Sequence, residues 1–452
     1  MKYKILVNKD NKIKKNYLSK VELITIKNIN NENIQIEKET YDAYEKLKSY
    51  LQYNNIFIGI RKAYENIIKP EDEYSEHSTG LAIDLSIKIE SSWLFDNSEL
   101  LKHISIFKKI AEHLADFGFI LRYPEDKEKI TSSSYKPWHI RYVGKIVAKI
   151  IMNNKYTLEE YLTNYAGIIV VNKPAGITSF DVVHIISKIL GIKKIGHTGT
   201  LDPIATGVLV VTVGKATKIG EELTATYKEY EAGVLLGLET DTLDITGKTL
   251  KTKKVSPNLP VENVLASFKK TYLQEVPIYS AVKVGGKKLY EYARQNKEIV
   301  LPKKEVIIKE ISLIQKENNS FTFKSVVSKG CYIRSLIRDI GYSLNTYATM
   351  TSLIRTKQGK FKIEEANLLE DIKKGEFTLH KIEDVLDYPK IRVNKEIEYK
   401  IRTGQKLKDL YNIENKVIFL DRHNNLLSIY QKEDSNLRVW KNFVNWSGTG
   451  SK

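Results

Sequence analysis

A glycine-punctuated segment near the middle of the chain presents a carboxylate directly before a proline. It reads Gly196-His197-Thr198-Gly199-Thr200-Leu201-Asp202-Pro203-Ile204-Ala205-Thr206-Gly207-Val208-Leu209. Pro203 fixes its own φ and restricts Asp202 to extended geometry, so the carboxylate is held in one direction. The glycines let the backbone approach a partner closely. An isolated Asp-Pro is more often a tight turn with an exposed aspartate, so the segment alone leaves both interpretations open.

Two histidines and an aspartate in the first third of the chain are residue types that bind zinc. His77 and Asp84 stand seven residues apart, and His139 follows Pro137-Trp138. Three protein ligands would leave a fourth position for an activated water, as in catalytic zinc sites. Spacing alone is a weak signal and favours scattered polar residues over a metal site.

The totals describe a soluble globular chain. Of its 452 residues, 42% are hydrophobic and 28% charged, and this length predicts two to four domains. The single cysteine, Cys331, excludes an internal disulfide framework and fits a reducing compartment; its apolar setting indicates a packing residue. No apolar run has the length of a signal peptide or a membrane span. We therefore expect a cytoplasmic protein without a membrane partner.

The charge indicates a polyanionic partner for the later part of the chain. Formal net charge is +17, and most of the basic excess lies after residue 160. An RNA partner would bind there, although the general abundance of lysine in this chain weakens charge as a sole argument.

Helices and strands alternate in the order expected of an α+β protein. Ile104, Phe107, Ile110 and Leu114 share one face of a predicted helix over 103–117 that stops at Gly118. A short apolar helix after 145 leads to a polar connector at 153–155. A strand over 168–171 follows, and then a helix to Leu190 that ends at Gly191, with Ser179 as its N-cap. Further strands are expected at 208–213, 229–236 and 320–327, with helices near 262–270 and 334–344.

These elements predict a large mixed sheet with a small β-rich appendage. The expected domains are an N-terminal extension (1–40), a small α+β domain (41–155), a catalytic domain (165–385) and a C-terminal domain (390–452).

The segment around Asp202 resembles the catalytic motif of the TruB family, the synthases that make pseudouridine at uridine 55 in the tRNA T-loop. The resemblance runs from about Gly167 to Ala366 and keeps the family's order of motifs. The matching residues are Lys173-Pro174 with Gly176 and Ser179, Tyr230, Thr240-Asp241-Thr242 with Asp244 and Gly247, Gly286-Lys287-Lys288-Leu289-Tyr290-Glu291-Tyr292-Ala293-Arg294, and Lys329-Gly330-Cys331-Tyr332-Ile333-Arg334. This many ordered matches decides against a turn without function.

The resemblance implies three catalytic residues. Pseudouridine formation breaks the N-glycosidic bond and rejoins the uracil through carbon, so a carboxylate must attack or stabilise the sugar C1′. This role falls on Asp202. Arg334 would hold that carboxylate ionised and oriented, and Tyr230 would stack on the uracil near the proton that leaves C5.

The resemblance also implies a set of RNA-binding residues. The target base is stacked inside a folded loop and must be flipped out; His197 would occupy the vacated space. Tyr332 and Leu353 would complete an apolar pocket, and Lys173 and Asp241 are the remaining substrate-binding candidates. The synthase reaction requires no cofactor, its partner is the T-arm of tRNA, and we expect a monomer.

The tail from about 390 to 447 resembles the small PUA-like β-barrel of these enzymes. Ile401-Arg402-Thr403-Gly404-Gln405 and Val417-Ile418-Phe419-Leu420-Asp421 carry the likeness. The resemblance implies that this domain grips the tRNA backbone away from the reacting base.

Residues 55–147 resemble the VanY-type D-alanyl-D-alanine carboxypeptidases. The resemblance implies zinc as candidate cofactor, with His77, Asp84 and His139 as its ligands, and a substrate-carboxylate role for Arg61. Where the family carries a glutamate as general base shortly before the last ligand, this chain has Lys136. A charged lysine cannot accept that proton and would repel the metal, so we predict a degenerate or repurposed peptidase domain. The supporting segments are Ser75-Glu76-His77-Ser78-Thr79-Gly80-Leu81-Ala82-Ile83-Asp84, Gly118-Phe119-Ile120-Leu121-Arg122-Tyr123-Pro124 and Trp138-His139-Ile140-Arg141-Tyr142-Val143-Gly144.

Three functions remain open from sequence. The leading one is a tRNA-modifying isomerase with a vestigial or accessory peptidase-like domain. The second is a cytoplasmic zinc D-Ala-D-Ala carboxypeptidase with an RNA-binding C-terminal part. The third is a non-catalytic tRNA chaperone. The intact synthase motifs and the incomplete peptidase set favour the first.

Overall fold

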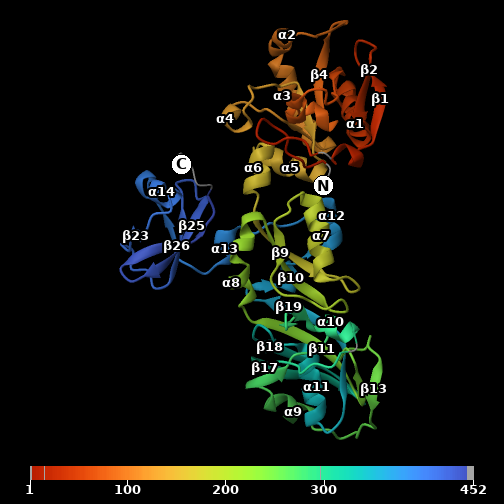
Figure 1. Ribbon diagram of the computed structural model, residues 1–452, viewed down its shortest axis with the longest axis vertical. Helices are drawn as coiled ribbons and strands as arrows, with labels where there is room; N and C mark the ends of the chain where they lie inside the picture. Colours follow the sequence, from red (N-terminus) through yellow and green to blue (C-terminus); the bar gives the residue numbers. More distant parts are fainter. Residues whose placement is uncertain (1–2, 15, 296, 445–452) are drawn as a thin grey trace. The chain divides into compact units, whose positions relative to one another are not determined.

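The computed structural model describes residues 3–14, 16–295 and 297–444, and this chain divides into two compact units (Figure 1). The first unit comprises the residues up to 165 together with 185–193, and the second comprises 166–184 and the residues from 194 onward. Both units mix helices and strands, which confirms the α+β prediction. Within the described residues, no helix is both long and apolar enough to cross a membrane.

The first unit is built on a sheet with the strand order β3-β4-β7-β6, to which β5 adds beside β4. A separate antiparallel hairpin, β1 with β2, precedes this sheet in the chain. The strands are β1 Leu23–Lys27, β2 Asn33–Glu37, β3 Ile58–Lys62, β4 Ala82–Ile89, β5 Ser92–Trp93, β6 Phe119–Leu121 and β7 His139–Tyr142. The helices are α1 Lys38–Tyr53, α2 Asn97–Leu101, α3 Ile104–His113, α4 Glu128–Thr131, α5 Lys145–Asn153 and α6 Leu158–Asn164.

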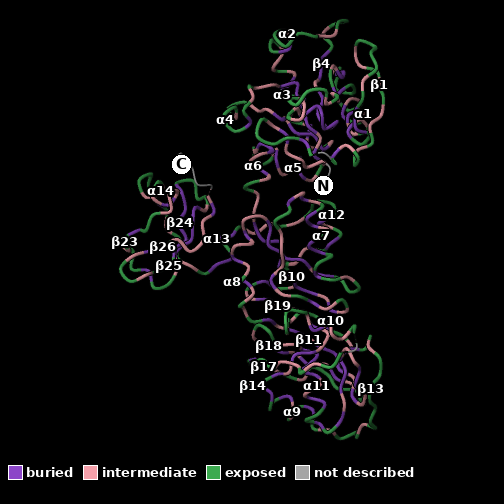
Figure 2. Tube along the Cα trace, in the orientation of Figure 1, coloured by how far each residue is buried: buried purple, intermediate pink, exposed green. Residues whose placement is uncertain are grey.

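The core of the first unit forms where α1 and α3 pack on the sheet. Leu47 of α1, Leu85 of β4 and Phe107 of α3 belong to one buried cluster, and Ile36 of the β2 strand joins it. Figure 2 shows the buried stretches of this unit in purple. The β1–β2 hairpin therefore contributes to the same core as the sheet.

The predicted helix over 103–117 is confirmed, with a change of geometry near its end. The α-helix α3 passes into a 3₁₀ turn at Leu114–Phe117, and Gly118 adopts φ +88 directly after it. A positive φ is accessible to glycine at little cost, so Gly118 ends the helix as the sequence indicates.

The second unit contains a long mixed sheet with the order β14-β17-β18-β11-β19-β10-β8-β21. Strand β20 pairs with β19, and β9 pairs with β10. The strands are β8 Gly167–Lys173, β9 Ile195–His197, β10 Thr206–Val213, β11 Lys228–Leu236, β14 Thr271–Glu275, β17 Lys303–Glu317, β18 Ser320–Val327, β19 Ala348–Gln358, β20 Phe361–Lys362 and β21 Asn367–Leu368. The strands predicted at 168–171, 208–213, 229–236 and 320–327 are thus confirmed.

Helices and two small hairpins complete the catalytic part of this unit. The helices predicted near 262–270 and 334–344 are α9 and α11. The elements are α7 Ser179–Leu190, α8 Gly220–Thr224, α9 Val261–Ser267, α10 Leu289–Arg294, α11 Ile333–Ser343, α12 Leu369–Lys374, α13 Ile382–Val385, β12 Leu238–Thr240, β13 Thr249–Thr252, β15 Lys283–Val284 and β16 Lys287–Lys288.

The prediction that Ser179 is the N-cap of α7 is wrong. The helix begins at Ser179, and the hydroxyl of Thr178 accepts the Asp181 backbone N–H at 3.1 Å. The Asp181 carboxylate in return accepts the Thr178 backbone N–H at 2.9 Å, which completes a reciprocal cap. The Ser179 hydroxyl is thereby released for another contact. Gly191, with φ +69, ends the helix as predicted.

The C-terminal part is β-rich as expected, but its described strands form an open sheet. The order is β22-β24-β25-β26-β23, and in the described chain the edge strands β22 and β23 do not pair. Residues 445–452 of the predicted domain lie outside the described residues. The elements are β22 Lys390–Arg392, α14 Lys395–Arg402, β23 Leu407–Lys408, β24 Lys416–Leu420, β25 Leu426–Glu433 and β26 Asn436–Asn442.

Candidate active site and candidate metal centre

Asp202 and Arg334, 132 positions apart in sequence, form a two-pronged ion pair. Nε of Arg334 lies 2.9 Å from Oδ2 of Asp202, and Nη2 donates a hydrogen bond to Oδ1 at 3.0 Å. The Arg334 side chain is 5% exposed, whereas that of Asp202 is 31% exposed. Only the Nη2 contact has hydrogen-bond geometry, and Nε contributes its charge beside the other carboxylate oxygen. The pair therefore orients the carboxylate and leaves part of it open to a reacting group.

The position of Arg334 is set by further contacts at the start of α11. Its Nη1 donates to the backbone carbonyl of Thr242 at 2.8 Å, and its Nη2 donates to that of Tyr279 at 3.0 Å. Oδ2 of Asp244 lies 4.0 Å from Nη1. The sequence motif contained Asp244 without a role for it, and the structure places it beside the arginine.

Tyr230 and Leu353 lie on one face of the central sheet. Strands β11 and β19 are antiparallel, with Ala232 opposite Leu353 and Tyr230 opposite Arg355. Residues two apart on a strand, and residues directly opposite each other, share a face. Tyr230 and Leu353 are each 6% exposed, so they offer a largely buried apolar surface.

Arg355 is a buried member of this site that sequence reasoning missed. Its Nε donates to the carbonyl of Val208 at 2.6 Å, its Nη2 to that of Gly199 at 2.9 Å, and its Nη1 to the hydroxyl of Tyr230 at 3.3 Å. The only sequence signal is a charged residue that follows the apolar and hydroxyl-bearing residues of β19.

Lys173 ties the turn after β8 to the Asp202 segment. Its ammonium donates to the carbonyls of Pro174 at 2.8 Å, Ile177 at 2.7 Å and Pro203 at 3.3 Å. Burial lowers the pKa of Lys173 to about 8, while the charge of Asp202 acts in the opposite direction. These bonds all go to the protein backbone, and a contact of Lys173 with substrate stays a prediction.

The other predicted RNA-binding residues are His197, Tyr332 and Asp241. His197 lies on β9 with its Nδ1 buried and unpartnered, and burial lowers its pKa. Tyr332 precedes α11, and its backbone N–H bonds to Oε1 of Gln274 at 2.8 Å. Asp241 lines a cavity of about 710 Å³ together with Tyr279. The cavity therefore borders the loop whose carbonyl holds Arg334.

Cys331 lies next to this set, and nothing about it indicates a nucleophile. Burial raises the pKa of its thiol to about 12. A thiol of that pKa is protonated at neutral pH and is a poor nucleophile, in agreement with the packing role expected for it.

In the first unit, the structure brings His77, Asp84 and His139 together. Asp84 and His139 are paired residues of β4 and β7, and His77 begins a 3₁₀ turn before β4. Nδ1 of His139 lies 2.7 Å from Oδ1 of Asp84, and Nε2 of His77 lies 3.4 Å from Oδ2. One possible ligand atom from each residue lies within 4.8 Å of the others.

This donor set fits a zinc ion. Bonds of about 2.1 Å in a tetrahedron separate two ligand atoms by about 3.4 Å, close to the distance of 3.4 Å between His77 and Asp84. The distance of 2.7 Å between His139 and Asp84 is shorter and is that of a direct hydrogen bond. The ring atoms pointing away, Nδ1 of His77 and Nε2 of His139, are buried without a partner. Metal-binding histidines usually donate that second N–H to a carboxylate or carbonyl, and this support is missing here.

The surroundings of the cluster are cationic. Nη2 of Arg61 lies 4.0 Å from Oδ2 of Asp84. The ammonium of Lys136 lies 5.1 Å from the centre of the Tyr123 ring, which in turn packs 4.9 Å from the His139 ring. The nearby carboxylate of Glu76 is bound by Arg122 at 2.8 Å and by Arg141.

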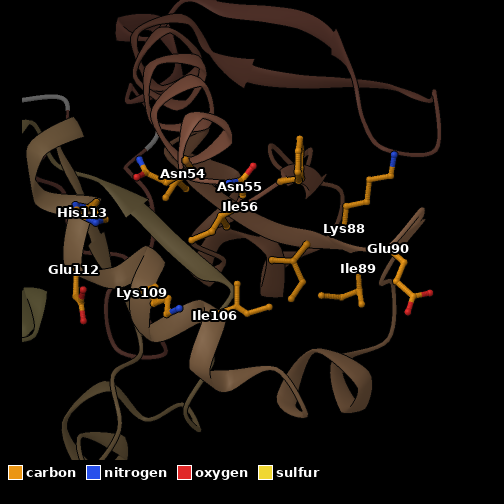
Figure 3. A pocket seen from close by; sticks show the side chains of 13 residues that line it. Asn54, Asn55, Ile56, Lys88, Ile89, Glu90, Ile106, Lys109, Glu112 and His113 are labelled. Carbon is orange, nitrogen blue, oxygen red and sulfur yellow. The ribbon is translucent and has the colours of Figure 1, made fainter.

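A separate cavity of about 580 Å³ opens between the end of α1, the end of β4 and α3 (Figure 3). Asn54, Lys88 and His113 are among its lining residues. None of the three metal-ligand candidates lines it, so it is distinct from the cluster and gains no chemistry from it.

Two different family models match parts of the chain. The model of the TruB family pseudouridylate synthase N-terminal domain matches residues 187–333. The model of the VanY D-alanyl-D-alanine carboxypeptidases matches residues 61–145.

Curated relatives of the second unit are named tRNA pseudouridine synthase B. That of Caldanaerobacter subterraneus subsp. tengcongensis is 42% identical over 277 residues, which are 60% of this chain and 97% of the relative. That of Fusobacterium nucleatum subsp. nucleatum is 42% identical over 283 residues, again 60% of this chain and 97% of the relative.

Solved structures also match parts of the chain. A chain of an H/ACA RNP bound to a substrate RNA containing 2′-deoxyuridine is 23% identical, with a TM-score of 0.49 over 65% of this chain and 89% of that chain. VanYB in complex with D-alanine-D-alanine is 27% identical, with a TM-score of 0.30 over 35% of this chain and 97% of that chain.

Proposed function

We propose, from the premise that this chain belongs to the TruB family of tRNA pseudouridine synthases, that it converts uridine 55 of the tRNA T-loop to pseudouridine with Asp202 as nucleophile. The observation that carries the proposal is the ion pair between Asp202 and Arg334. It supplies an oriented and partly exposed carboxylate, in a loop that Arg355 links to Tyr230.

The reaction can be written with these residues alone. The Asp202 carboxylate attacks C1′ of the ribose, and the electron pair of the broken C1′–N1 bond goes to N1 of the uracil. The uracil turns over between Tyr230 and Leu353, and C5 then attacks C1′ and releases Asp202. The C5 proton leaves last, near the hydroxyl of Tyr230, and passes to water, while N1 takes a proton from water, so that the net reaction is an isomerisation. Arg334 keeps the carboxylate ionised and oriented throughout.

Base flipping is the step that admits the uridine to this buried site. We assign His197 to the space that the flipped base leaves. The T-arm backbone would lie along the cavity lined by Asp241, and the C-terminal sheet would act as the PUA-like grip on more distant phosphates. We place the enzyme in the cytoplasm as a monomer, where its tRNA substrate is found.

Tritium release tests the proposal directly, because the reaction removes hydrogen from C5. A T-arm RNA labelled at C5 of its uridines is incubated with the wild-type chain, Asp202→Asn and Asp387→Asn. Asp387 has a 95% exposed side chain paired with Lys360, which makes it the matched control. We expect release by the wild type and the control, and background release by Asp202→Asn. Primer extension after carbodiimide treatment then locates the modified position.

The possible results separate the parts of the proposal. Release from Asp202→Asn at the wild-type rate contradicts the assignment of the nucleophile. Modification at another uridine of the T-arm contradicts position 55. If the wild type binds the RNA tightly without any release, the chaperone function replaces the enzyme.

A second function is favoured by the His77–Asp84–His139 cluster, which we propose holds zinc without peptidase activity. When bound, zinc would polarise a carbonyl or activate a water. Among the described side chains near the cluster, Glu76 is neutralised by two arginines, and Lys136 has no capacity to accept a proton while charged. The residues present therefore support metal binding better than hydrolysis.

Metal content tests this function independently of the synthase. The wild-type chain, purified without chelator, should carry stoichiometric zinc by plasma mass spectrometry, and His139→Ala should lose it. His113→Ala, a change in a histidine that lines the separate cavity, should retain it. Zinc-free wild-type protein would refute the metal site. Release of D-alanine from a D-Ala-D-Ala peptide by the zinc-loaded chain would refute the absence of peptidase activity.

A further inference from the structure

Arg355 connects three elements of the synthase site through one buried side chain. The residue is 1% exposed, and its three donor groups point to β10, to the loop before Asp202 and to β11. The acceptors are the carbonyl of Val208, the carbonyl of Gly199 and the hydroxyl of Tyr230. The aspartate loop and the tyrosine are therefore tied to the same planar group.

The charge of Arg355 has no acidic partner. Within the described residues, no carboxylate oxygen forms an ion pair with it, and its guanidinium carbon lies 5.8 Å from the centre of the Tyr230 ring. Burying an unpaired cation is costly, and arginine tolerates it only through hydrogen bonds at each arm of its fork. A residue kept at such a cost has a role that an apolar side chain would not fulfil.

The bond to Tyr230 also has a fixed direction. Arginine has donors and no acceptor, so the phenolic oxygen of Tyr230 accepts this hydrogen bond. The hydroxyl proton of Tyr230 must then point away from Arg355. Arg355 therefore sets the orientation of the tyrosine hydroxyl as well as the position of its oxygen.

The backbone around Arg355 is equally constrained. Gly207 pairs with Arg355 across the parallel strands β10 and β19 and has φ +99. A Cβ at Gly207 would lie 2.3 Å from the carbonyl oxygen of Arg355, so glycine is required for this approach. The close contact fixes the start of β10, which the Asp202 segment leads into, against the strand that carries the arginine.

Two other side chains hold the same loop without reaching the tyrosine. The Ser179 hydroxyl accepts the Leu201 N–H at 2.8 Å and donates to its carbonyl at 3.2 Å. Lys173 binds the carbonyl of Pro203 at 3.3 Å. Gly199, Leu201 and Pro203 are thus anchored at alternate positions, with Asp202 between the last two.

We propose that Arg355 is a positioning residue that sets the separation between the Asp202 carboxylate and the Tyr230 ring, with Ser179 as a second anchor of the loop. This inference rests on the proposed roles of Asp202 and Tyr230. The positioning role requires the three nitrogens of the arginine guanidinium, because the single nitrogen of lysine cannot reach three acceptors that lie in three directions. A displacement of about 1 Å between reacting groups can cost about 100-fold in rate.

The test measures single-turnover pseudouridine formation and RNA affinity in parallel. Arg355→Lys and Arg355→Met should each lower the rate about 100-fold, with the dissociation constant for the T-arm RNA within about threefold of wild type. Arg338→Lys is the matched control, since that arginine lies on α11 and binds Glu275 and Asp339. It should retain the wild-type rate.

A second variant covers the case in which the Arg355 variants do not fold. Ser179→Ala removes one loop anchor and should lower the rate about tenfold with unchanged RNA affinity. Ser187→Ala is its control on α7, because the Ser187 hydroxyl bonds to the carbonyl of Ile192. Thermal unfolding of every variant is recorded alongside.

The outcomes distinguish a positioning role of Arg355 from an effect of its charge alone, of RNA affinity or of folding. A wild-type rate in Arg355→Lys, or in Ser179→Ala, overturns the inference. So does a loss of rate that equals the loss of RNA affinity or follows the loss of thermal stability. If Arg355→Lys is impaired as expected while Asp202→Asn retains activity, the proposed function fails instead.

Discussion

Replacing Arg334 by lysine isolates the contribution of the two-pronged pair with Asp202. The change keeps the positive charge, but one ammonium can reproduce only one of the contacts at 2.9 and 3.0 Å. A hydrogen bond to a charged group contributes about 1.5–3 kcal/mol net, and 1.36 kcal/mol corresponds to tenfold in rate. Asp202 is 31% exposed, so water compensates in part. We expect a rate lowered about 10- to 100-fold.

The assay is single-turnover tritium release from T-arm RNA labelled at C5, with enzyme in excess over RNA. Arg338→Lys, on the same helix but paired with other carboxylates, should match the wild type. RNA affinity is measured by fluorescence anisotropy and should stay within about threefold of wild type. A rate within threefold of wild type in Arg334→Lys would refute the reasoning, because charge alone would then suffice. A loss confined to RNA affinity would refute it equally.

Three further predictions concern stability. Burial lowers the pKa of Lys173 from 10.5 to about 8, so between these values the unfolded chain binds more protons. The wild type should therefore gain stability relative to Lys173→Met between pH 8 and 10.5, measured by urea unfolding; a constant difference would contradict this. Gly207→Ala should destabilise the chain by about 3 kcal/mol, whereas Gly220→Ala, with open space around its Cβ, should be nearly neutral in the same assay. Thr178→Ala should cost about 1 kcal/mol through loss of the α7 cap, and an unchanged urea midpoint would show that the cap is unimportant.

Secondary structure was predictable where the signal is local. The helical face that includes Phe107 and Ile110, the stop at Gly118 and the strands around 168–171 and 208–213 all follow from side-chain period and turn residues. The error at Ser179 has the same origin. Thr178 and Ser179 are both good caps, and only the bonds of Ser179 to Leu201 show which of them the helix uses.

The sequence did not predict whether the C-terminal sheet closes into a barrel. Alternating short strands with Gly and Asn turns predict a β-rich domain, but they do not determine whether its edges meet. In the described residues β22 and β23 remain at opposite edges of the sheet. Edge pairing depends on the twist accumulated over the whole sheet, which no single segment encodes.

The sequence by itself determined the chemistry that this protein can carry. Ordered motifs around Asp202 and Arg334 specified the family and predicted which carboxylate reacts, and Lys136 indicated that a peptidase-like set is incomplete. Those conclusions depend only on residue types at given positions.

Only the tertiary structure decided how the residues are held. Arg355 was not predicted as a site residue, and Asp244 belonged to a motif without a role of its own. Strand β19 lies between β10 and β11 and carries Arg355, and Asp244 forms an isolated bridge with Met350 of the same strand. Hydrogen bonds between such segments join residues more than a hundred positions apart. Their geometry is fixed by the packing of the whole unit, so no local stretch of sequence contains it.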